Sequence, residues 1–343
     1  MKINLLRLIS FSLVFLFLTR CGSTSSSQKP VTYAIYTVGS DPWGIAIDAS
    51  GNVWVANGGT NTISEITSKG APVTTVTVYW GPLGIAIDGS GNIWVTNSGD
   101  NISEVTSKGT PLTTVTIGND PTSSATGIAI DASGNVWIAN GGSNDNPGQT
   151  ISEVTSAGAI MTTVTVGKWP LGIAIDGLGN IWVTNRGTNT ISKITSNGTL
   201  VTTVTVGSDP WGIAIDASGN VWVANHYGNT ISEVTSSGRL VRTVNVGEGP
   251  MGIAIDASGN VWVTNLFGFS INEITSAGAI ERTITDVLNP MGIAIDASGD
   301  VWVTNNGGNT VTELIGITKG PQYFPCQYTP GNGCPMFQGG GNF

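Results

Sequence analysis

His226 is the only histidine in the sequence, and an imidazole is the side chain best suited to act as a general base near neutral pH. It follows Asn225 at the end of a predicted strand and precedes Tyr227, so we expect it to lie on an exposed loop. No Ser, His, Asp set and no Cys, His pair has a pattern typical of nucleophilic catalysis. Because exposed loop histidines often have no catalytic function, proton transfer by His226 is one hypothesis beside a binding or structural role.

Aromatic side chains gather in the loops that lead into one predicted strand of each repeat. Four tryptophans occupy these loops where other repeats have Thr, Met or Leu. Flat rings stack on sugars or apolar ligands, and nearby charges orient the ligand. Alternatively, each tryptophan covers its own repeat after a proline. The predicted ligand-binding residues are Trp43, Trp80, Lys168, Trp169, Arg186, Asp209, Trp211, Tyr227, Glu248 and Phe267.

An aspartate opens an Asp-x-x-Gly turn in every repeat, which superficially resembles an oxygen-ligand calcium loop. Each turn lacks the alternating acidic residues that such a loop needs. An Asp that hydrogen-bonds its own turn, with Gly at positive φ, explains the pattern without a metal. We therefore predict a structural role for Asp48, Asp88, Asp131, Asp176, Asp216, Asp256 and Asp296.

Two further polar series recur in the repeats. Asparagines end the second predicted strand, and we predict that they form turns: Asn57, Asn97, Asn140, Asn185, Asn225, Asn265 and Asn305. Glutamates lie between apolar residues of the third strand, and we predict that they face solvent: Glu65, Glu104, Glu153, Glu233, Glu273 and Glu313. Lys193 replaces the glutamate of the fourth repeat.

All these residues belong to a sevenfold repeat whose Gly-Ile-Ala-Ile-Asp block starts at Gly44, Gly84, Gly127, Gly172, Gly212, Gly252 and Gly292. A period near 40 residues with several alternating strands predicts a radial repeat architecture. In the first repeat we predict strands at 44–48, 53–57, 62–67 and 73–78. Trp54 and its six counterparts fill the wedge against the next repeat. The fold class is therefore all-β, a seven-bladed β-propeller of four-stranded antiparallel blades.

The two ends of the repeat region complement each other. The last repeat supplies three strands, and residues 31–38 have the pattern of the missing fourth strand. We predict that this N-terminal strand closes the last blade. The predicted segments are 1–21 (signal), 22–30 (Ser-rich tether), 31–317 (propeller) and 318–343 (tail). Differences in loop length, as between Asn140 and Glu153, fall on the face that also carries the aromatic loops.

Composition limits the class of partner. The chain is 40% hydrophobic and 10% charged with 48 glycines, as suits an all-β protein with many tight turns. Its net charge of -9 and thinly spread basic residues exclude nucleic acid as an expected partner. We expect a monomer that binds a protein, peptide or glycan ligand, and we expect no cofactor.

The N-terminus predicts export. Lys2 and Arg7 lie beside an apolar run at 8–18, and Cys21 follows in a segment that resembles the bacterial lipobox, although Arg20 departs from it. We expect an extracytoplasmic protein, lipid-anchored at Cys21 or secreted, with membrane contact through the lipid only. In an oxidising compartment Cys326 and Cys334 could form a disulfide in the tail.

The Gly-Ile-Ala-Ile-Asp and Gly-Asn-Val-Trp-Val-Thr-Asn blocks resemble those of NHL and YVTN-type propellers of bacteria, and more broadly the virginiamycin B lyase-like group. The resemblance covers about residues 31–317. Resemblance to the streptogramin lyase implies a magnesium-assisted elimination that opens a cyclic antibiotic at its ester, with His as base and further His and Glu residues around the metal. A calcium hydrolase resembling gluconolactonase is a weaker alternative.

With His226 as its only histidine, the chain cannot supply the several His residues that this resemblance implies. We therefore expect a non-catalytic binding or scaffold module, with a carbon-oxygen lyase using His226 and magnesium or calcium as the alternative. A structural cell-surface protein is the second alternative.

Overall fold

The computed structural model describes residues 31–71, 74–117, 124–143 and 145–318. The predicted signal, the predicted tether and residues 319–343 of the predicted tail lie outside the described residues, and so do Cys21, Cys326 and Cys334. None of the described segments forms a helix long and apolar enough to cross a bilayer.

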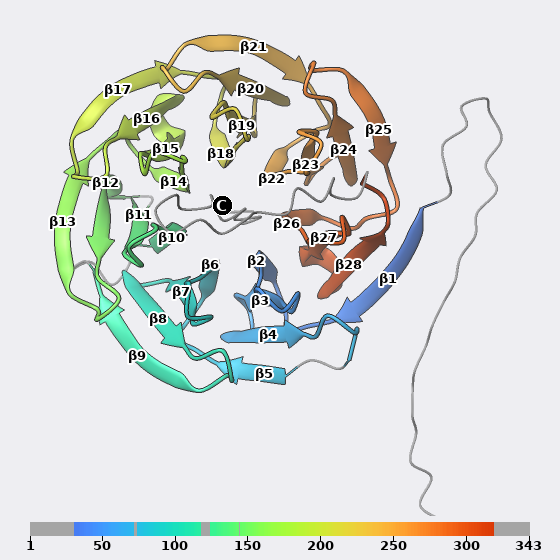
Figure 1. Cartoon of the computed structure of the whole chain (residues 1–343), viewed down its shortest axis with the longest axis horizontal. Helices are drawn as coiled ribbons and strands as arrows, with labels where there is room; N and C mark the ends of the chain where they lie inside the picture. The colour runs from blue at the N-terminus through green and yellow to red at the C-terminus, as the bar shows by residue number, and fades with distance from the viewer. Residues whose placement is uncertain (1–30, 72–73, 118–123, 144, 319–343) are drawn as a thin grey trace, which may run out of the picture.

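Seven four-stranded antiparallel sheets form a closed ring (Figure 1). The inner strands are β2 (Pro42–Ile47), β6 (Pro82–Ile87), β10 (Ser124–Ile130), β14 (Pro170–Ile175), β18 (Pro210–Ile215), β22 (Pro250–Ile255) and β26 (Pro290–Ile295). The second strands are β3 (Val53–Asn57), β7 (Ile93–Asn97), β11 (Val136–Gly142), β15 (Ile181–Asn185), β19 (Val221–Asn225), β23 (Val261–Asn265) and β27 (Val301–Asn305). We number the blades 1 to 7 in this order.

The outer half of each blade has the same plan. The third strands are β4 (Thr62–Ile66), β8 (Asn101–Val105), β12 (Pro147–Val154), β16 (Thr190–Ile194), β20 (Thr230–Val234), β24 (Ser270–Ile274) and β28 (Thr310–Ile315). The outer strands are β5 (Thr74–Thr77), β9 (Pro111–Thr116), β13 (Ile160–Thr165), β17 (Leu200–Thr205), β21 (Leu240–Asn245), β25 (Ile280–Ile284) and β1 (Thr32–Thr37). The described residues also form two short 3-10 turns, η1 (Arg186–Thr188) and η2 (Asn306–Gly308).

The ring closes as predicted, because β1 pairs antiparallel with β28 in blade 7. The Tyr36 ring stacks on Trp302 with centroids 5.5 Å apart. Its hydroxyl donates to Glu313 Oε2 at 2.7 Å, and burial together with this contact raises the pKa of Tyr36. The N-terminal strand is therefore held to the last blade by side chains as well as by the backbone.

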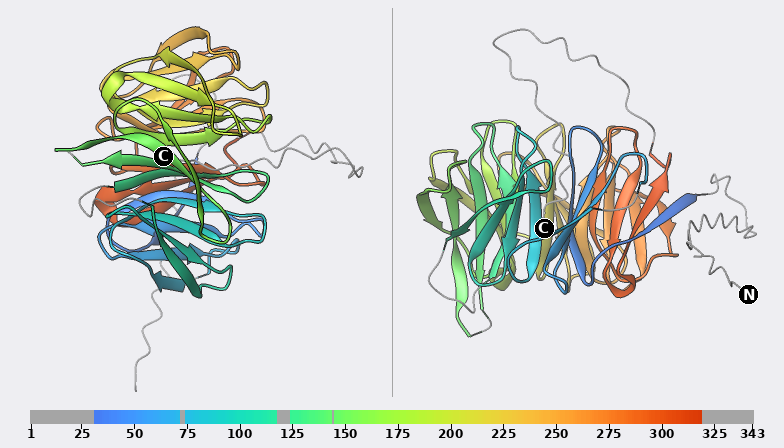
Figure 2. Two further views of the ribbon diagram at one scale, coloured as in Figure 1. Left: turned by 90° about the vertical axis from the view of Figure 1, so that its left-hand side faces the viewer. Right: turned by 90° about the horizontal axis from the view of Figure 1, so that it is seen from below.

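The loops lie on two opposite faces of the ring (Figure 2). The loop into the inner strand and the loop between the second and third strands share the face that we call the top. The β11–β12 hairpin, green in Figure 2, projects beyond its neighbours. Its strands have 7 and 8 residues, whereas the corresponding strands of blade 1 have 5 each.

Each repeated tryptophan is buried against the next blade. Trp54, for example, packs with Ile85, Ile93 and Val95 of blade 2. Its Nε1 donates to Oδ2 of Asp48 at 3.3 Å. The Asp therefore binds its own turn and the neighbouring indole together, which supports the predicted structural role.

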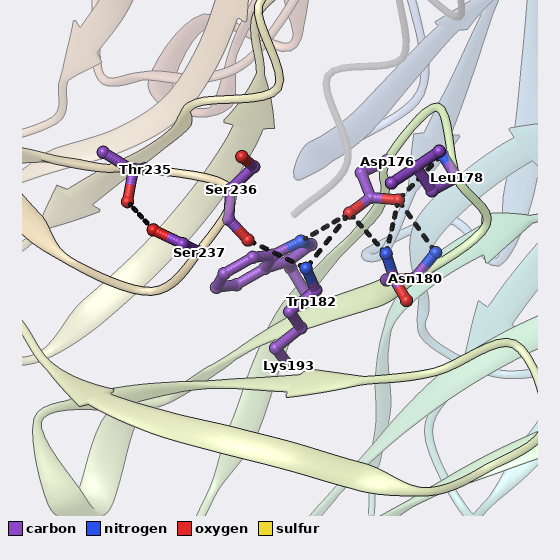
Figure 3. Close-up of polar contacts among 8 residues, drawn as sticks. All are labelled: Asp176, Leu178, Asn180, Trp182, Lys193, Thr235, Ser236 and Ser237. Carbon is purple, nitrogen blue, oxygen red and sulfur yellow. Dashed lines mark hydrogen bonds and ion pairs between the residues drawn. The ribbon is translucent and has the colours of Figure 1, made fainter.

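In the fourth blade, a lysine connects the aspartate of this turn to the next blade (Figure 3). Asp176 Oδ2 accepts from Trp182 Nε1 at 3.2 Å and lies 3.8 Å from Lys193 Nζ. The Lys193 ammonium also lies 5.1 Å from the Trp182 ring centroid and donates to the Ser236 carbonyl of blade 5 at 2.8 Å. Lys193 therefore connects two blades, which a solvent-facing residue would not do.

The prediction that the third-strand glutamates face solvent is wrong. Glu104 lies directly opposite Trp94 across the strand pair, so both point toward the next blade. Asn92 Nδ2 donates to Glu104 Oε1 at 3.1 Å, while burial and the nearby Asp88 raise the pKa of Glu104. The buried members of the series are Glu104, Glu153, Glu233 and Glu273.

The prediction that the second-strand asparagines form turns is also wrong. Asn57 is buried, and its Nδ2 donates to Thr62 Oγ1 at 3.1 Å and Ser64 Oγ at 2.9 Å. These bonds connect the second strand to the third. The left-handed turn residue is Asn61 instead, with φ of 56°.

The inner strands approach so closely that glycine is required. A Cβ at Gly212 would lie 2.2 Å from the carbonyl oxygen of Met251 in the next blade. The Met251 backbone cannot move away without disturbing the next blade, and overpacking of this kind typically lowers stability by about 1–3 kcal/mol. We expect Gly212→Ala to lower the free energy of unfolding by at least that amount, as measured by urea denaturation.

Gly89→Ala is the matched control. A Cβ at Gly89 meets nothing within 4 Å, and its φ is not left-handed. This substitution should leave stability unchanged or raise it by about 0.4–1 kcal/mol, because alanine restricts the unfolded chain. Equal losses in the two variants would contradict the close approach of the inner strands.

Candidate ligand-binding site

The two top loops of a blade are held together by backbone hydrogen bonds. His226 N donates to the Asp209 carbonyl at 2.8 Å in blade 5, and Arg186 N donates to the Trp169 carbonyl at 3.0 Å in blade 4. The described residues just before the inner-strand proline are left-handed in six blades: Asp41, Gly81, Trp169, Asp209, Gly249 and Asn289. The same backbone therefore presents different side chains around the top face.

Arg186 extends from blade 4 to blade 5. Its Nε donates to Asp209 Oδ1 at 2.5 Å, and its guanidinium carbon lies 5.2 Å from the Trp211 centroid and 5.9 Å from the Trp169 centroid. Asp209 Oδ2 accepts from Trp211 Nε1 at 3.0 Å, and the Asp209 N–H donates to Asn189 Oδ1. One buried carboxylate thus positions a cation and an indole that stack on each other.

His226 continues this row of rings. Its centroid lies 5.2 Å from Trp211, 5.1 Å from Tyr227 and 5.2 Å from Phe267, with tilted planes. Such distances are typical of favourable aromatic pairs. His226 is only 4% exposed, so the expectation of an exposed histidine is wrong. Neighbouring rings cover it, which the order of residues along the chain does not reveal.

Burial keeps the imidazole neutral. Loss of solvent lowers the pKa of His226, and the Arg186 charge acts in the same direction, whereas Asp209 opposes them. The carbonyl groups of Pro250 and Gly249 also favour the protonated ring. Nδ1 is buried and has no partner in hydrogen-bonding geometry among the described residues. The imidazole is therefore surrounded by three aromatic rings and by the carbonyl groups of Pro250 and Gly249.

Gly249 allows the His226 and Phe267 rings to meet. A Cβ at this position would lie 2.7 Å from Phe267 Cδ2 and 3.1 Å from His226 Cε1. The backbone there has φ of 65°, which glycine adopts without strain. Asp209 occupies the equivalent position in the preceding blade, where its side chain binds Arg186 instead.

We refer to Trp169, Arg186, Asp209, Trp211, His226, Tyr227 and Phe267 as the top-face cluster. Tyr227 is 65% exposed and Phe267 52%, while the Arg186 side chain is 35% exposed. The cluster therefore combines a buried centre with rings and a guanidinium that solvent can reach. It spans blades 4 to 6.

Trp169 of the cluster and the nearby Phe269 are bulky residues with a left-handed backbone. Trp169 has φ of 49° and Phe269 has φ of 46°, at positions where the left-handed residues of other blades are Asp, Asn or Gly. This conformation costs bulky residues on the order of 1 kcal/mol or more. The Trp169 indole donates to the Ser143 carbonyl at 3.3 Å, but Phe269 is an exposed side chain. The structure therefore holds two aromatic rings in strained positions.

The remaining predicted residues divide into two groups. Lys168 and Glu248 are exposed next to the cluster, and their carbonyls accept from Gly187 N and Phe267 N. Trp43, in contrast, lies against Gly58 within blade 1. Trp80 is exposed in the loop between β5 and β6 of blades 1 and 2. These two tryptophans therefore belong to blade 1 and to the loop into blade 2, whereas the top-face cluster belongs to blades 4 to 6.

Sequence reasoning missed two residues that shape the cluster. Gly249 leaves space for two rings, and Asn189 fixes the backbone of Asp209 from the preceding blade. Both belong to the series of left-handed loop positions. Alignment of the repeats at these positions would have singled them out.

The residues present do not fit a catalytic metal of the kind implied by the resemblance. Among the described residues there is no group of three or more His, Cys, Asp or Glu side chains that could hold a metal ion. The only acidic residue in the top-face cluster is Asp209, and Arg186 and Trp211 already occupy both of its oxygens. The top-face cluster is therefore unsuited to hold a catalytic magnesium or calcium ion.

A model of the virginiamycin B lyase family matches residues 71–323 of the chain. No curated protein matches the sequence.

The fold is similar to that of solved lyase structures. A streptogramin B lyase superposes with a TM-score of 0.74 at 22% identity, covering 82% of this chain and 97% of that one. A selenomethionine-substituted virginiamycin B lyase from Staphylococcus aureus gives 0.73 at 23%, covering 82% and 99%. A catalytically inactive variant of the Staphylococcus aureus lyase with quinupristin gives 0.73 at 24%, again covering 82% and 99%. At these identities the similarity shows the fold alone.

The dependence of stability on pH tests the neutral state of His226. Because burial lowers the pKa of His226 below its ordinary 6.5, the folded chain binds fewer protons than the unfolded chain just below that pH. The stabilising contribution is complete above the unfolded pKa and is lost as the pH falls toward the folded pKa. His226→Phe keeps an aromatic ring without a titrating group, so this loss should disappear.

Urea denaturation of both proteins between about pH 5 and 8 measures the difference. Subtracting the two curves removes the titration of the carboxylates, which both proteins share. Parallel curves would show that His226 titrates like an exposed histidine and would contradict its neutral, buried state.

Proposed function

Since the chain belongs to the virginiamycin B lyase family, we propose that it uses the seven-bladed propeller of that family as a non-catalytic binding module. The ligand would bind the top-face cluster of blades 4 to 6. The observation that best supports this proposal is a continuous row of side chains in contact: Trp169, Arg186, Trp211, His226 and Phe267.

The cluster has the properties of a stacking surface. Arg186 is fixed by Asp209 and stacked on Trp211, so little side-chain entropy remains to be lost when a ligand binds. Tyr227 and Phe267 are exposed and supply apolar area. Flat or apolar groups of a ligand gain contact area here without displacing hydrogen-bonded residues.

The same proposal includes an extracytoplasmic location and a lipid at Cys21. β1 is the outer strand of blade 7, and its N-terminal end lies at the face opposite the top loops. Val31 is the tenth residue after Cys21, so the chain between them spans at most about 33–36 Å. A lipid anchor would therefore leave the top face directed away from the membrane.

As a purely structural cell-surface protein, the chain would need no aromatic cluster at all.

A carbon-oxygen lyase is the second candidate function, and the neutral imidazole of His226 favours it. A neutral ring accepts a proton, and burial favours the neutral ring by lowering the pKa of His226. Its burial and the lack of a three-ligand metal cluster in the described residues weigh against this candidate.

Ligand arrays test the binding function. Residues 31–343 should bind members of a peptide array or a glycan array. Trp169→Ala/Trp211→Ala should reduce that binding about fivefold or more, since each of the two stacking contacts contributes about 0.5–1.5 kcal/mol. Trp80→Ala is the matched control, because Trp80 is exposed but lies outside the cluster. Equal binding by wild type and double variant would exclude the cluster as the site.

Quinupristin tests the lyase. We expect no ring opening when the purified chain is incubated with quinupristin and magnesium and the mixture is followed by liquid chromatography. A new product that His226→Gln abolishes would overturn the non-catalytic proposal. His226→Gln must retain the far-UV circular dichroism spectrum of the wild type for this comparison.

A further inference from the structure

Exposed charges of opposite sign flank the top-face cluster. Lys168 and the terminal amino groups of Arg186 lie on the loops of blade 4, whereas Glu248 lies on the loop into blade 6. Aromatic rings of blades 5 and 6 lie between them. We propose that the top face binds a dipolar peptide, with a carboxylate over blade 4, an apolar or aromatic residue over the rings and an ammonium over blade 6. This inference rests on the proposed binding function.

The blade 4 side is suited to a carboxylate. Of the three guanidinium nitrogens of Arg186, only Nε donates to Asp209, and the two terminal amino groups have no hydrogen-bond partner among the described residues. A guanidinium presents such amino groups in a plane that matches a carboxylate. Stacking on Trp211 and Trp169 fixes the orientation of that plane. Lys168 adds an exposed positive charge on the adjoining loop.

The blade 6 side is suited to a cation. Glu248 is exposed, and its carbonyl accepts from the N–H groups of Phe267 at 3.1 Å and Gly268 at 2.9 Å. These bonds fix the backbone of Glu248 against the loop that carries Phe267 and Phe269. An ammonium or guanidinium bound there meets a carboxylate and nearby aromatic rings, which are both favourable for a cation.

Backbone strain marks both ends of this surface. Trp169 lies at the blade 4 end and Phe269 at the blade 6 end, and both are left-handed. In four other blades the residue equivalent to Phe269 is an asparagine whose Oδ1 accepts from the next loop, as Asn229 does from Gly249 N. Phe269 gives up that bond. Retention of an exposed ring at the expense of stability is expected where the ring contacts a ligand.

Charge separation favours a peptide over a neutral glycan. A neutral sugar gains from the rings but not from charges placed at two ends of the surface. A peptide supplies a carboxylate, an ammonium and an apolar side chain on one flexible chain. The predicted affinity therefore depends on both charges of the ligand. The contribution of the carboxylate depends on the blade 4 side of the surface, and that of the ammonium depends on the blade 6 side.

A charge-coupling cycle tests this proposal. The probes are acetylated, amidated peptides with Asp at one end, Lys at the other and a spacer of two to five residues containing Phe and Tyr. Control peptides carry Asn for Asp or Gln for Lys. Binding to wild type, Lys168→Gln and Glu248→Gln is measured by isothermal titration calorimetry. Neither substituted residue belongs to the top-face cluster.

We expect Lys168→Gln to weaken binding of the Asp peptides about two- to fivefold and to leave the Asn peptides unchanged, as for other exposed ion pairs. Glu248→Gln should do the same for Lys against Gln peptides. Peptide binding without this coupling would overturn the dipolar inference alone. Binding of no peptide in the series, with glycan binding by the same protein, would overturn the peptide and retain the binding module.

Phe269→Asn separates a ligand contact from a structural role. Asparagine suits the left-handed backbone and restores the acceptor for Asn289 N, so the melting temperature should rise by about 2 °C or more. Affinity for the dipolar peptides should fall severalfold. A variant that loses stability, or that gains stability without losing affinity, would contradict the assignment of Phe269 to the ligand surface.

Discussion

The close approach of neighbouring inner strands is the constraint on which the ring depends. Cβ atoms at Gly84, Gly252 and Gly292 would lie 2.3–2.4 Å from carbonyl oxygens of the following blade. Where the second strand has Thr, its hydroxyl donates to that same carbonyl, as Thr184 does to Trp211 at 2.9 Å. The bare glycine and the hydroxyl together set the spacing between blades. The backbone of Trp211, and with it the base of the top-face cluster, is held by this contact.

Much of the fold could be predicted because the physical causes repeat along the chain. Alternation of apolar residues, turn glycines and one tryptophan per repeat each recur seven times, and the missing last strand has its counterpart at 31–38. The predictions for Glu104 and Asn57 were wrong for the same reason. Their burial depends on the adjoining strand or blade, which a pattern within one strand does not contain. A polar residue between apolar neighbours looks exposed until that partner is known.

The candidate site could be located from the sequence only in part. Departures from the repeat indicated the top loops, and several of the predicted residues do gather in blades 4 to 6. Their order along the chain could not separate Trp80, which lies apart, from Trp211, which contacts His226. The distinction depends on which loops of different blades meet. The importance of Gly249 could not be predicted from the sequence either, because this residue acts through the space that it leaves between the His226 and Phe267 rings.

Binding and proton transfer place opposite demands on His226. A general base must reach the proton that it removes. The rings of Trp211, Tyr227 and Phe267 instead cover the imidazole, and burial lowers its pKa. The same contacts make it a good support for a stacking surface, because a neutral ring packs without the cost of a buried charge. Catalysis would require this packing to open, whereas binding requires it to remain closed.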